Sequence, residues 1–233
     1  MIRAVAVVVP AHDEERLLGG CLESVRRAAA HPRLRGLPVT TVVAADSCRD
    51  ATAEVARGHG ATVLEVAARR VGAARSLATG HVLARLTGPG GALRAAEVWL
   101  AHTDADSRVP ADWLAHQLDL AEAGFHAVVG LVEVADWSEH PAGVAERFHR
   151  RYHGYPGEQP HPHVHGANLA VRADAYTAAG GFPPLAVGED HALVAALEAA
   201  GRRIHRTETH PVRTSARRTP RAPHGFGDLL LTL

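Results

Sequence analysis

Two aspartates one residue apart, Asp104 and Asp106, follow the apolar run 98–100 in the segment HTDADSRVP. In an extended segment, residues i and i+2 point to the same side, so both carboxylates can face one point in space. Like charges held this close raise one pKa unless a cation neutralises them. Oxygen ligands suit a hard divalent ion, Mg²⁺ or Mn²⁺, whose shell water and ligand phosphates would complete. The alternative is a turn in which one aspartate caps the chain before Pro110.

Further carboxylates follow apolar runs or open predicted helices. Glu14 follows the first apolar run of the chain, and Asp46 follows the second. A carboxylate just past the second strand often meets a ribose or a base edge in nucleotide-binding α/β folds. Glu189 and Asp190 open an amphipathic segment, where a carboxylate aimed into a cleft can act as a general base. For Glu14, Glu189 and Asp190 the alternative is stabilisation of a helix dipole.

Histidine and arginine gather in the second half of the chain. His161, His163 and His165 occupy alternate positions in HPHVHGAN, a spacing that could hold zinc. The Pro-rich context and the lack of a matching downstream set argue against a zinc hydrolase. The segment THPVRTSARR brings His210 together with three arginines, and arginine clusters bind diphosphates bidentately. A solvated basic tail is the alternative.

All 25 basic residues are arginine, because the sequence contains no lysine. This composition excludes Schiff-base chemistry and a P-loop lysine, so phosphate recognition must use arginine, backbone N–H groups or a metal. The 25 acidic residues balance the charge, and no overall field recruits nucleic acid or an anionic membrane. Cys21 and Cys48 form no disulfide framework and are expected to be small buried apolar groups.

Alternating apolar runs and amphipathic segments must position these residues. Such alternation with short connections predicts a parallel, doubly wound sheet, in which ligands bind at the carboxyl ends of the strands. The predicted strands are 4–9, 39–45, 61–66, 98–102, 127–135, 164–171 and 203–207. The predicted helices are 14–30, 50–59, 70–86, 111–123, 141–153, 173–179 and 189–200. The segments 154–163 and 208–224 are expected to be loops, and the pattern changes after residue 125.

We expect one α/β domain over residues 1–233, because no linker is long enough to separate two. No run approaches 18 apolar residues, so no transmembrane helix is expected. The N-terminus lacks the long apolar region and cleavage pattern of a signal peptide, which favours a soluble, cytoplasmic protein. The apolar closing segment 225–233 either covers an interface, as in a homodimer, or closes the site.

Five stretches, in order along the chain, resemble a family 2 glycosyltransferase of the GT-A fold. They are VVVPAHDEERLLGGCLESV, DSCRDAT, RRVGAARSLATGHVLA, HTDADSRVPADWL and HGANLAVRADAYTAAGGFPPLAVGEDHALVAAL. The resemblance implies a single Rossmann-like GT-A domain. Residues 1–107 would then form its nucleotide-sugar-binding half, and residues 108–233 its acceptor-side half with the C-terminal loop.

The resemblance also implies an activity and a set of roles. The chain would be a nucleotide-sugar-dependent, hexosyltransferase-like enzyme that needs a divalent cation, Mn²⁺ or Mg²⁺. The family's Gln-x-x-Arg-Trp motif of processive synthases is absent, which favours transfer of one sugar to a small, soluble acceptor. The implied roles are donor binding by Pro10, Ala11, Glu14, Asp46, Arg75 and Asp104, metal binding by Asp104, Asp106 and His210, catalysis by Asp190 with Glu189, and an acceptor side at His165, Gly166 and Asn168.

Several alternatives stay open at this stage. A base at Asp190 implies inversion at the anomeric carbon, whereas a late metal-binding histidine such as His210 occurs in some retaining relatives. The chain departs from the family pattern at His12, Asp13 and Ser47, the last replacing a glycine. A sugar nucleotidyltransferase and a non-catalytic nucleotide-sugar-binding protein are the competing functions. The sequence does not specify the donor, the acceptor, the metal or the oligomeric state.

Overall fold

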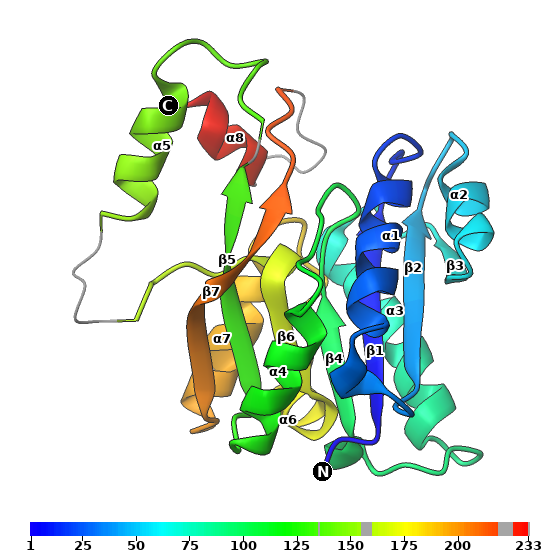
Figure 1. The fold of residues 1–233 in the computed structure, drawn as a ribbon. Coiled ribbons are helices and arrows are strands. Elements are labelled where there is room, and N and C mark those ends of the chain that lie inside the picture. The colour runs from blue at the N-terminus through cyan, green and yellow to red at the C-terminus, as the bar shows by residue number, and fades with distance from the viewer. Residues whose placement is uncertain (135, 155–159, 219–225, 233) are drawn as a thin grey trace.

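A computed structural model describes residues 1–134, 136–154, 160–218 and 226–232 of the chain. Among these residues, the centre is a seven-stranded sheet in the order β3-β2-β1-β4-β6-β5-β7 (Figure 1). The predicted α/β class with a mostly parallel sheet is confirmed, and β6 alone runs antiparallel to its two neighbours. The strands are β1 Ala4–Ala11, β2 Val39–Asp46, β3 Thr62–Val66, β4 Val98–His102, β5 Ala127–Val134, β6 Leu169–Arg172 and β7 Ile204–Thr214.

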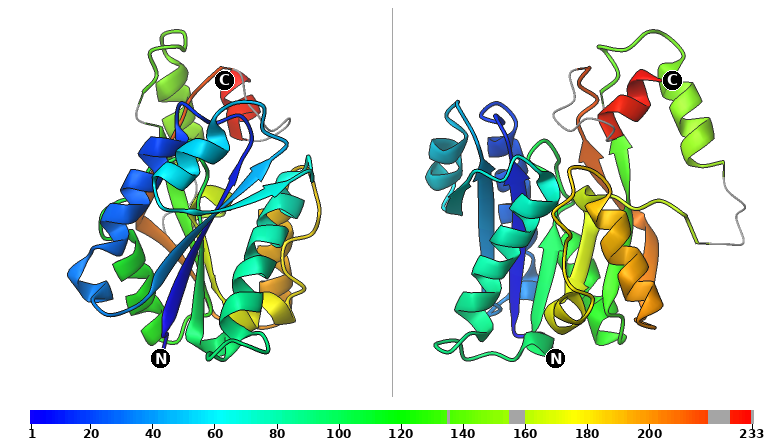
Figure 2. Two further views of the ribbon diagram at one scale, coloured as in Figure 1. Left: turned by 90° about the vertical axis from the view of Figure 1, so that its right-hand side faces the viewer. Right: turned by 180° about the vertical axis from the view of Figure 1, so that it is seen from behind.

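Helices cover both faces of the sheet (Figure 2). One face is packed by α1 Leu18–Ala29, α2 Thr52–Gly58 and α4 Trp113–Glu122. The other face is packed by α3 Val71–Thr87, α6 Ala173–Ala178 and α7 Glu189–Ala199. Beyond these two layers lie α5 Val144–Tyr152 and α8 Phe226–Leu231, and the short 3-10 turns are η1 Pro32–Leu34, η2 Ala95–Glu97 and η3 Gly166–Asn168.

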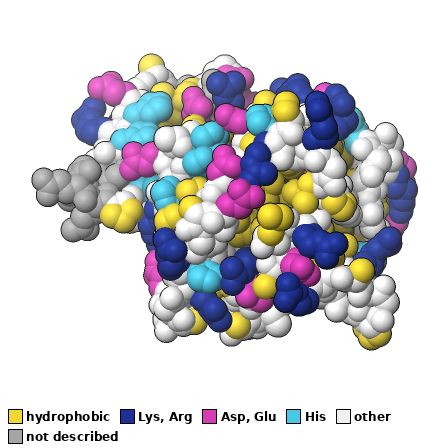
Figure 3. Space-filling model, turned by 60° about the horizontal axis from the view of Figure 1, so that its bottom comes forward, with side chains coloured by type: hydrophobic (Ala, Val, Ile, Leu, Met, Phe, Trp, Pro, Cys, Tyr) yellow, Lys and Arg dark blue, Asp and Glu magenta, His cyan; other side chains and the backbone are white. Residues whose placement is uncertain are grey.

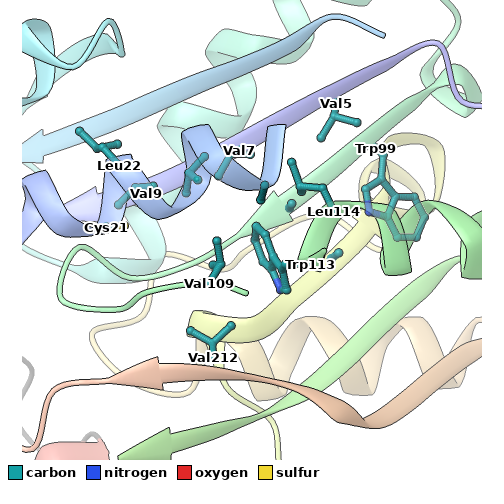
Figure 4. Close-up of a cluster of buried hydrophobic side chains, with 14 of the residues drawn as sticks. Val5, Val7, Val9, Cys21, Leu22, Trp99, Val109, Trp113, Leu114 and Val212 are labelled. Carbon is teal, nitrogen blue, oxygen red and sulfur yellow. The ribbon is translucent and has the colours of Figure 1, made fainter. Parts of the chain in front are cut away.

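The apolar runs become central strands because they are buried on both faces. In β1, the side chains of Val5, Val7 and Val9 belong to the core on the α1 side, whereas Ala6 and Val8 belong to the opposite core. On the α1 side, two tryptophans, Trp99 and Trp113, pack against these valines (Figure 4). A two-sided core fixes the register of β1 between β2 and β4, and therefore fixes where the polar residues after each strand lie.

The end of the chain departs most from the predicted elements. The last strand was expected over 203–207, but β7 continues to Thr214 at the edge of the sheet. Pro211 is tolerated there because an edge strand has a free side that needs no N–H donor. The predicted strand 164–171 is represented by the shorter β6, which follows η3. Parts of the expected loops 154–163 and 208–224, and parts of the closing segment 225–233, lie outside the described residues.

The surface carries mixed charge on the face shown in Figure 3, where basic and acidic side chains lie next to one another. Such an arrangement agrees with the equal totals of basic and acidic residues in the sequence. In the described part of the chain, the helices are too short or too polar to cross a membrane.

Candidate active site

A cavity of about 900 Å³ lies at the carboxyl ends of β1, β2 and β4. Parallel strands end on the same edge of a sheet, so residues that are far apart in sequence meet there. The lining includes eleven of the thirteen predicted site residues, ten of which are Pro10, Ala11, Glu14, Asp46, Arg75, Asp104, Asp106, Gly166, Glu189 and Asp190. His165 also lines it, whereas Asn168 and His210 do not.

One end of the cavity, at the ends of β1 and β2, is built by three tight loops. Asp46 is buried at the end of β2, and its Oδ1 accepts a hydrogen bond of 2.9 Å from the backbone N–H of Arg69. Asp13, Ser47 and Arg69 all adopt positive φ, between 50° and 55°. Non-glycine residues in this region are strained by about 1–3 kcal/mol and gather at binding sites. Ser47, which stands where the resemblance expects a glycine, thus has a left-handed backbone conformation.

Arg75 connects the two ends of the cavity. Its guanidinium is buried, and it pairs with Asp104 through Nη2. Nε donates to Oε1 of Glu189 at 3.1 Å, and Nη1 donates to the carbonyl of Gly166 at 2.9 Å. Burial raises the pKa of Glu189, and the charge of Arg75 opposes that shift. The prediction that Arg75 lies near Asp104 matches this geometry, and the same side chain also fixes the start of α7.

Asp104 and Asp106 both reach the cavity, but each is held by a different arginine. Asp106 Oδ2 accepts a hydrogen bond of 2.8 Å from Arg217 Nη2. Burial raises the pKa of Asp106 to about 6, with Asp104 and Glu14 adding to the rise and Arg217 opposing it. A carboxylate whose negative charge is this poorly solvated gains from a further cation. The two carboxylates therefore fit a divalent ion chemically, with Asp106 as the more buried ligand.

The opposite end of the cavity centres on Asp190 in the first turn of α7. Its Oδ2 accepts a 2.7 Å hydrogen bond from the backbone N–H of Gly166, and Oδ1 accepts one of 2.8 Å from the N–H of His191. His165 lies beside it, and its Nε2 is 2.8 Å from the hydroxyl of Tyr152. Burial lowers the pKa of His165 to about 4, although the charge of Asp190 opposes this. The imidazole is thus neutral at pH 7.

Asn168 and His210 have other surroundings. The buried amide of Asn168 donates to the carbonyls of Leu131 and His210 at 2.8 and 3.0 Å. The ring of His210 stacks on His116 with centroids 3.9 Å apart, and its Nε2 is 3.2 Å from Asp112 Oδ2. Because β7 packs against α4 at this point, the structure does not bring His210 to the two aspartates. Asn168 likewise has a bridging position within the fold rather than one on the cavity wall.

The three alternate histidines do not form a metal cluster. The rings of His161, His163 and His165 stack about 6 Å apart, at centroid distances of 6.2 and 6.0 Å. Nε2 of His161 and His163 instead bond to backbone carbonyls. Within the described ranges, one group has ligand atoms close enough for a metal, Asp13 with Cys48 and Asp50. Those two carboxylates already accept backbone N–H bonds from Arg49, Glu15 and Thr52.

Arg217, one of the three arginines that the sequence offered as a diphosphate-binding cluster, lines the cavity. Arg217 lies three residues beyond the end of β7 and enters the cavity beside Glu14 and Asp106. In the sequence it is one of several arginines in a segment predicted to be a loop. If the sequence had predicted a strand that ends at Thr214 rather than at residue 207, Arg217 would have been recognised as a residue that follows a strand end.

Comparison with known families identifies the class. The chain matches the family described as Glycosyl transferase family 2 over residues 6–178 and belongs to that family. A curated relative is the 4,4'-diaponeurosporenoate glycosyltransferase of Staphylococcus aureus, 36% identical over 64 residues, which are 28% of this chain and 15% of that protein. The chain therefore matches only a small part of the length of that relative.

Solved structures with the same fold are glycosyltransferases, and the predicted GT-A fold is confirmed. S. aureus TarS 1–349 in complex with UDP-GlcNAc has a TM-score of 0.65 and 13% identity, over 97% of this chain and 62% of that one. Mannosyltransferase PcManGT from Pyrobaculum calidifontis in complex with GDP-Man and Mn²⁺ has a TM-score of 0.60 and 22% identity, over 88% and 55%. Glucosyl-3-phosphoglycerate synthase from Mycobacterium tuberculosis with Mn²⁺ and UDP has a TM-score of 0.58 and 20% identity, over 94% and 73%.

Proposed function

We propose that the protein is a metal-dependent glycosyltransferase that moves one sugar from a nucleotide diphosphate sugar to an acceptor. The observation that carries this proposal is one cavity in which Asp46, Asp104, Asp106 and Asp190 converge from three separate segments, the ends of β2 and β4 and the start of α7. Structures of the same fold hold UDP-GlcNAc, or GDP-Man with Mn²⁺. We assign the nucleoside to the loops around Asp46 and the acceptor to the side of Asp190.

We assign the divalent cation, Mn²⁺ or Mg²⁺, to Asp106 with support from Asp104. Both side chains offer oxygen ligands, and a positive charge offsets the burial of Asp106. When bound, such an ion stabilises the charge that the leaving nucleoside diphosphate gains. His210 is left out of this ligand set because its ring stacks on His116 and contacts Asp112.

The base that we assign is Asp190. Glu189 is paired with the buried Arg75, so its carboxylate is engaged in fixing α7. Asp190 lines the cavity and is oriented by the N–H groups of Gly166 and His191. In an inverting transfer, the acceptor oxygen bonds to the anomeric carbon as the bond to the diphosphate breaks, and Asp190 takes the hydroxyl proton. A small soluble acceptor, a cytoplasmic location and a homodimer stay predictions.

The proposal is tested by donor binding. Purified protein is melted with a panel of UDP- and GDP-sugars, with Mn²⁺ or with a chelator. A matching donor at about a hundredfold excess over its Kd should stabilise the fold by about 2.7 kcal/mol. Asp106→Ala should remove the part of the shift that depends on Mn²⁺. No shift with any donor would contradict the proposal, and a shift without sugar transfer to any acceptor would favour a binding protein.

A further inference from the structure

Arg217 is bonded to the carboxylate of Asp106, which is also a ligand of the proposed cation. Its Nη1 and Nη2 donate to Oε2 and Oε1 of Glu14 at 2.8 and 2.5 Å, and Nη2 also donates to Oδ2 of Asp106 at 2.8 Å. Glu14 lies 203 residues away in sequence, so this contact ties the end of the chain to the first loop of the sheet. The side chains of Glu14 and Asp106 are 6% and 15% exposed, and that of Arg217 is 23% exposed.

A guanidinium and a divalent ion compete at Asp106. Mg²⁺ binds oxygen ligands at about 2.0–2.1 Å, so an ion at Oδ2 would lie next to the guanidinium that now bonds this atom. In a partly buried site, two adjacent positive charges repel strongly because solvent screens them poorly. An ion that binds Oδ2 of Asp106 therefore displaces Arg217 from this hydrogen bond.

After losing this hydrogen bond, Arg217 is still held near the cavity by its buried neighbours in the chain. Val212 is fully buried in the core on the α1 side, and Ala216, directly before Arg217, packs in the cluster that α5 and α8 form. Arg217 therefore stays near the cavity. Under the proposed function, the strongest anion there is the diphosphate that the cation holds. A planar guanidinium matches phosphate oxygens bidentately, and the chain has no lysine to do so.

We propose that Arg217 is a diphosphate-binding residue that holds Glu14 and Asp106 in the cation-free enzyme and exchanges them for the diphosphate when the cation binds. The proposal rests on the function proposed above and adds a residue to the donor site. Its signature is two effects of opposite sign from one substitution. Removal of Arg217 should help the cation to bind and hinder the binding of the nucleoside diphosphate.

The test compares Arg217→Gln with Arg218→Gln, a neighbouring exposed arginine that does not line the cavity. Mn²⁺ is titrated first without nucleotide, with free Mn²⁺ followed by electron paramagnetic resonance. Arg217→Gln should bind Mn²⁺ about tenfold more tightly than the wild type, since a charge-assisted hydrogen bond no longer competes. UDP and GDP are then titrated calorimetrically in excess Mn²⁺, and the better ligand should bind Arg217→Gln about tenfold more weakly. Arg218→Gln should match the wild type in both titrations.

The outcomes separate the proposal from a structural role. Weaker or unchanged Mn²⁺ binding by Arg217→Gln would overturn the exchange, and unchanged nucleotide binding would overturn the diphosphate contact. If Arg217→Gln does not fold, Arg217→Lys should show the same two opposite shifts in smaller size, because lysine keeps the charge without the bidentate fork. If the wild type binds neither UDP nor GDP, the proposed function is in doubt, while the Mn²⁺ titration still decides the exchange.

Discussion

At the scale of the residue, the two acidic neighbours at the start of α7 differ in what holds them. Glu189 is 4% exposed and bonded to Arg75, whereas Asp190 is held by two backbone N–H groups and lies on the cavity wall. Arg75 thereby joins Asp104, on the proposed donor side, to Glu189 at the start of α7. One buried guanidinium sets the spacing between the carboxylates that the proposed reaction needs.

We expect Asp190→Asn to lose sugar transfer and to keep donor binding. An amide cannot accept the acceptor's proton, and general-base catalysis contributes about 10²–10⁴-fold to such reactions. The rate of transfer and the donor-induced rise in Tm are measured on the same preparation. Asp119→Asn, an exposed carboxylate on α4, should leave both readings unchanged. Transfer at the wild-type rate by Asp190→Asn would remove Asp190 from the mechanism.

The sequence predicted the positions of the carboxylates that follow strands better than those of the arginines in the last segment. Asp46, Asp104 and Asp106 could be placed in advance because apolar runs mark strand ends clearly. Arg217 was indicated only as a member of an arginine cluster in an expected loop, because Pro211 and the polar residues around it do not show that β7 continues to Thr214. His210 was placed at the metal by resemblance, but the register of β7 directs its ring toward α4.

At the scale of the element, α3 packs unusually closely against the loop that leads into α7. A Cβ on Gly72 would lie 2.9 Å from both Cβ of Glu189 and the carbonyl oxygen of Leu185, and closer still to that of Pro183. The backbone N–H of Gly72 also donates to the carbonyl of Leu185 at 3.0 Å. The absence of a side chain at this position lets the first turn of α3 support the start of α7, which carries the proposed base.

We expect Gly72→Ala to lower the free energy of unfolding by about 1–3 kcal/mol, because the added methyl group overpacks this contact. Gly80→Ala on the same helix is the matched control, because nothing lies within 4 Å of a Cβ there. Alanine at that position should stabilise the helix by about 0.5–1 kcal/mol. Urea denaturation measures both changes, and equal effects of the two substitutions would contradict the packing argument.

The elements themselves were predicted to different degrees. The central strands β1, β2 and β4 were identified because burial on both faces leaves continuous apolar runs. The direction of β6 was not, because four residues carry no signal for a parallel or an antiparallel partner. The turn before β6 was also missed, because the sequence does not show that Asn168 bridges two carbonyls inside the fold.

At the scale of the whole molecule, the histidines make stability depend on pH. In the described residues, burial lowers the pKa of seven of them, His102, His116, His126, His161, His163, His165 and His205. Such rings take up protons more readily in the unfolded chain than in the folded one. The unfolded state therefore gains protons first as the pH falls from about 6.5, the usual histidine value, and folding weakens.

We expect the free energy of unfolding to decrease between pH 7 and pH 5. His165 alone, with its pKa at about 4, should contribute about 2 kcal/mol to this loss. The measurement is urea denaturation at both pH values for the wild type and for His165→Asn. The variant should lose less stability on acidification than the wild type does. An equal loss in both proteins would show that His165 is protonated as readily in the fold as outside it.

The two cysteines differ in exposure, although burial raises the pKa of both thiols. Cys21 is fully buried in the core, and burial raises the pKa of its thiol. Cys48 is only partly buried, and its Sγ lies 3.5 Å from the carbonyl of Ala11, a residue of the cavity wall. A thiol-reactive fluorophore should consequently attach at one position in the native, unmutated chain. Its emission would then report the arrival of a nucleotide in real time, without an engineered cysteine.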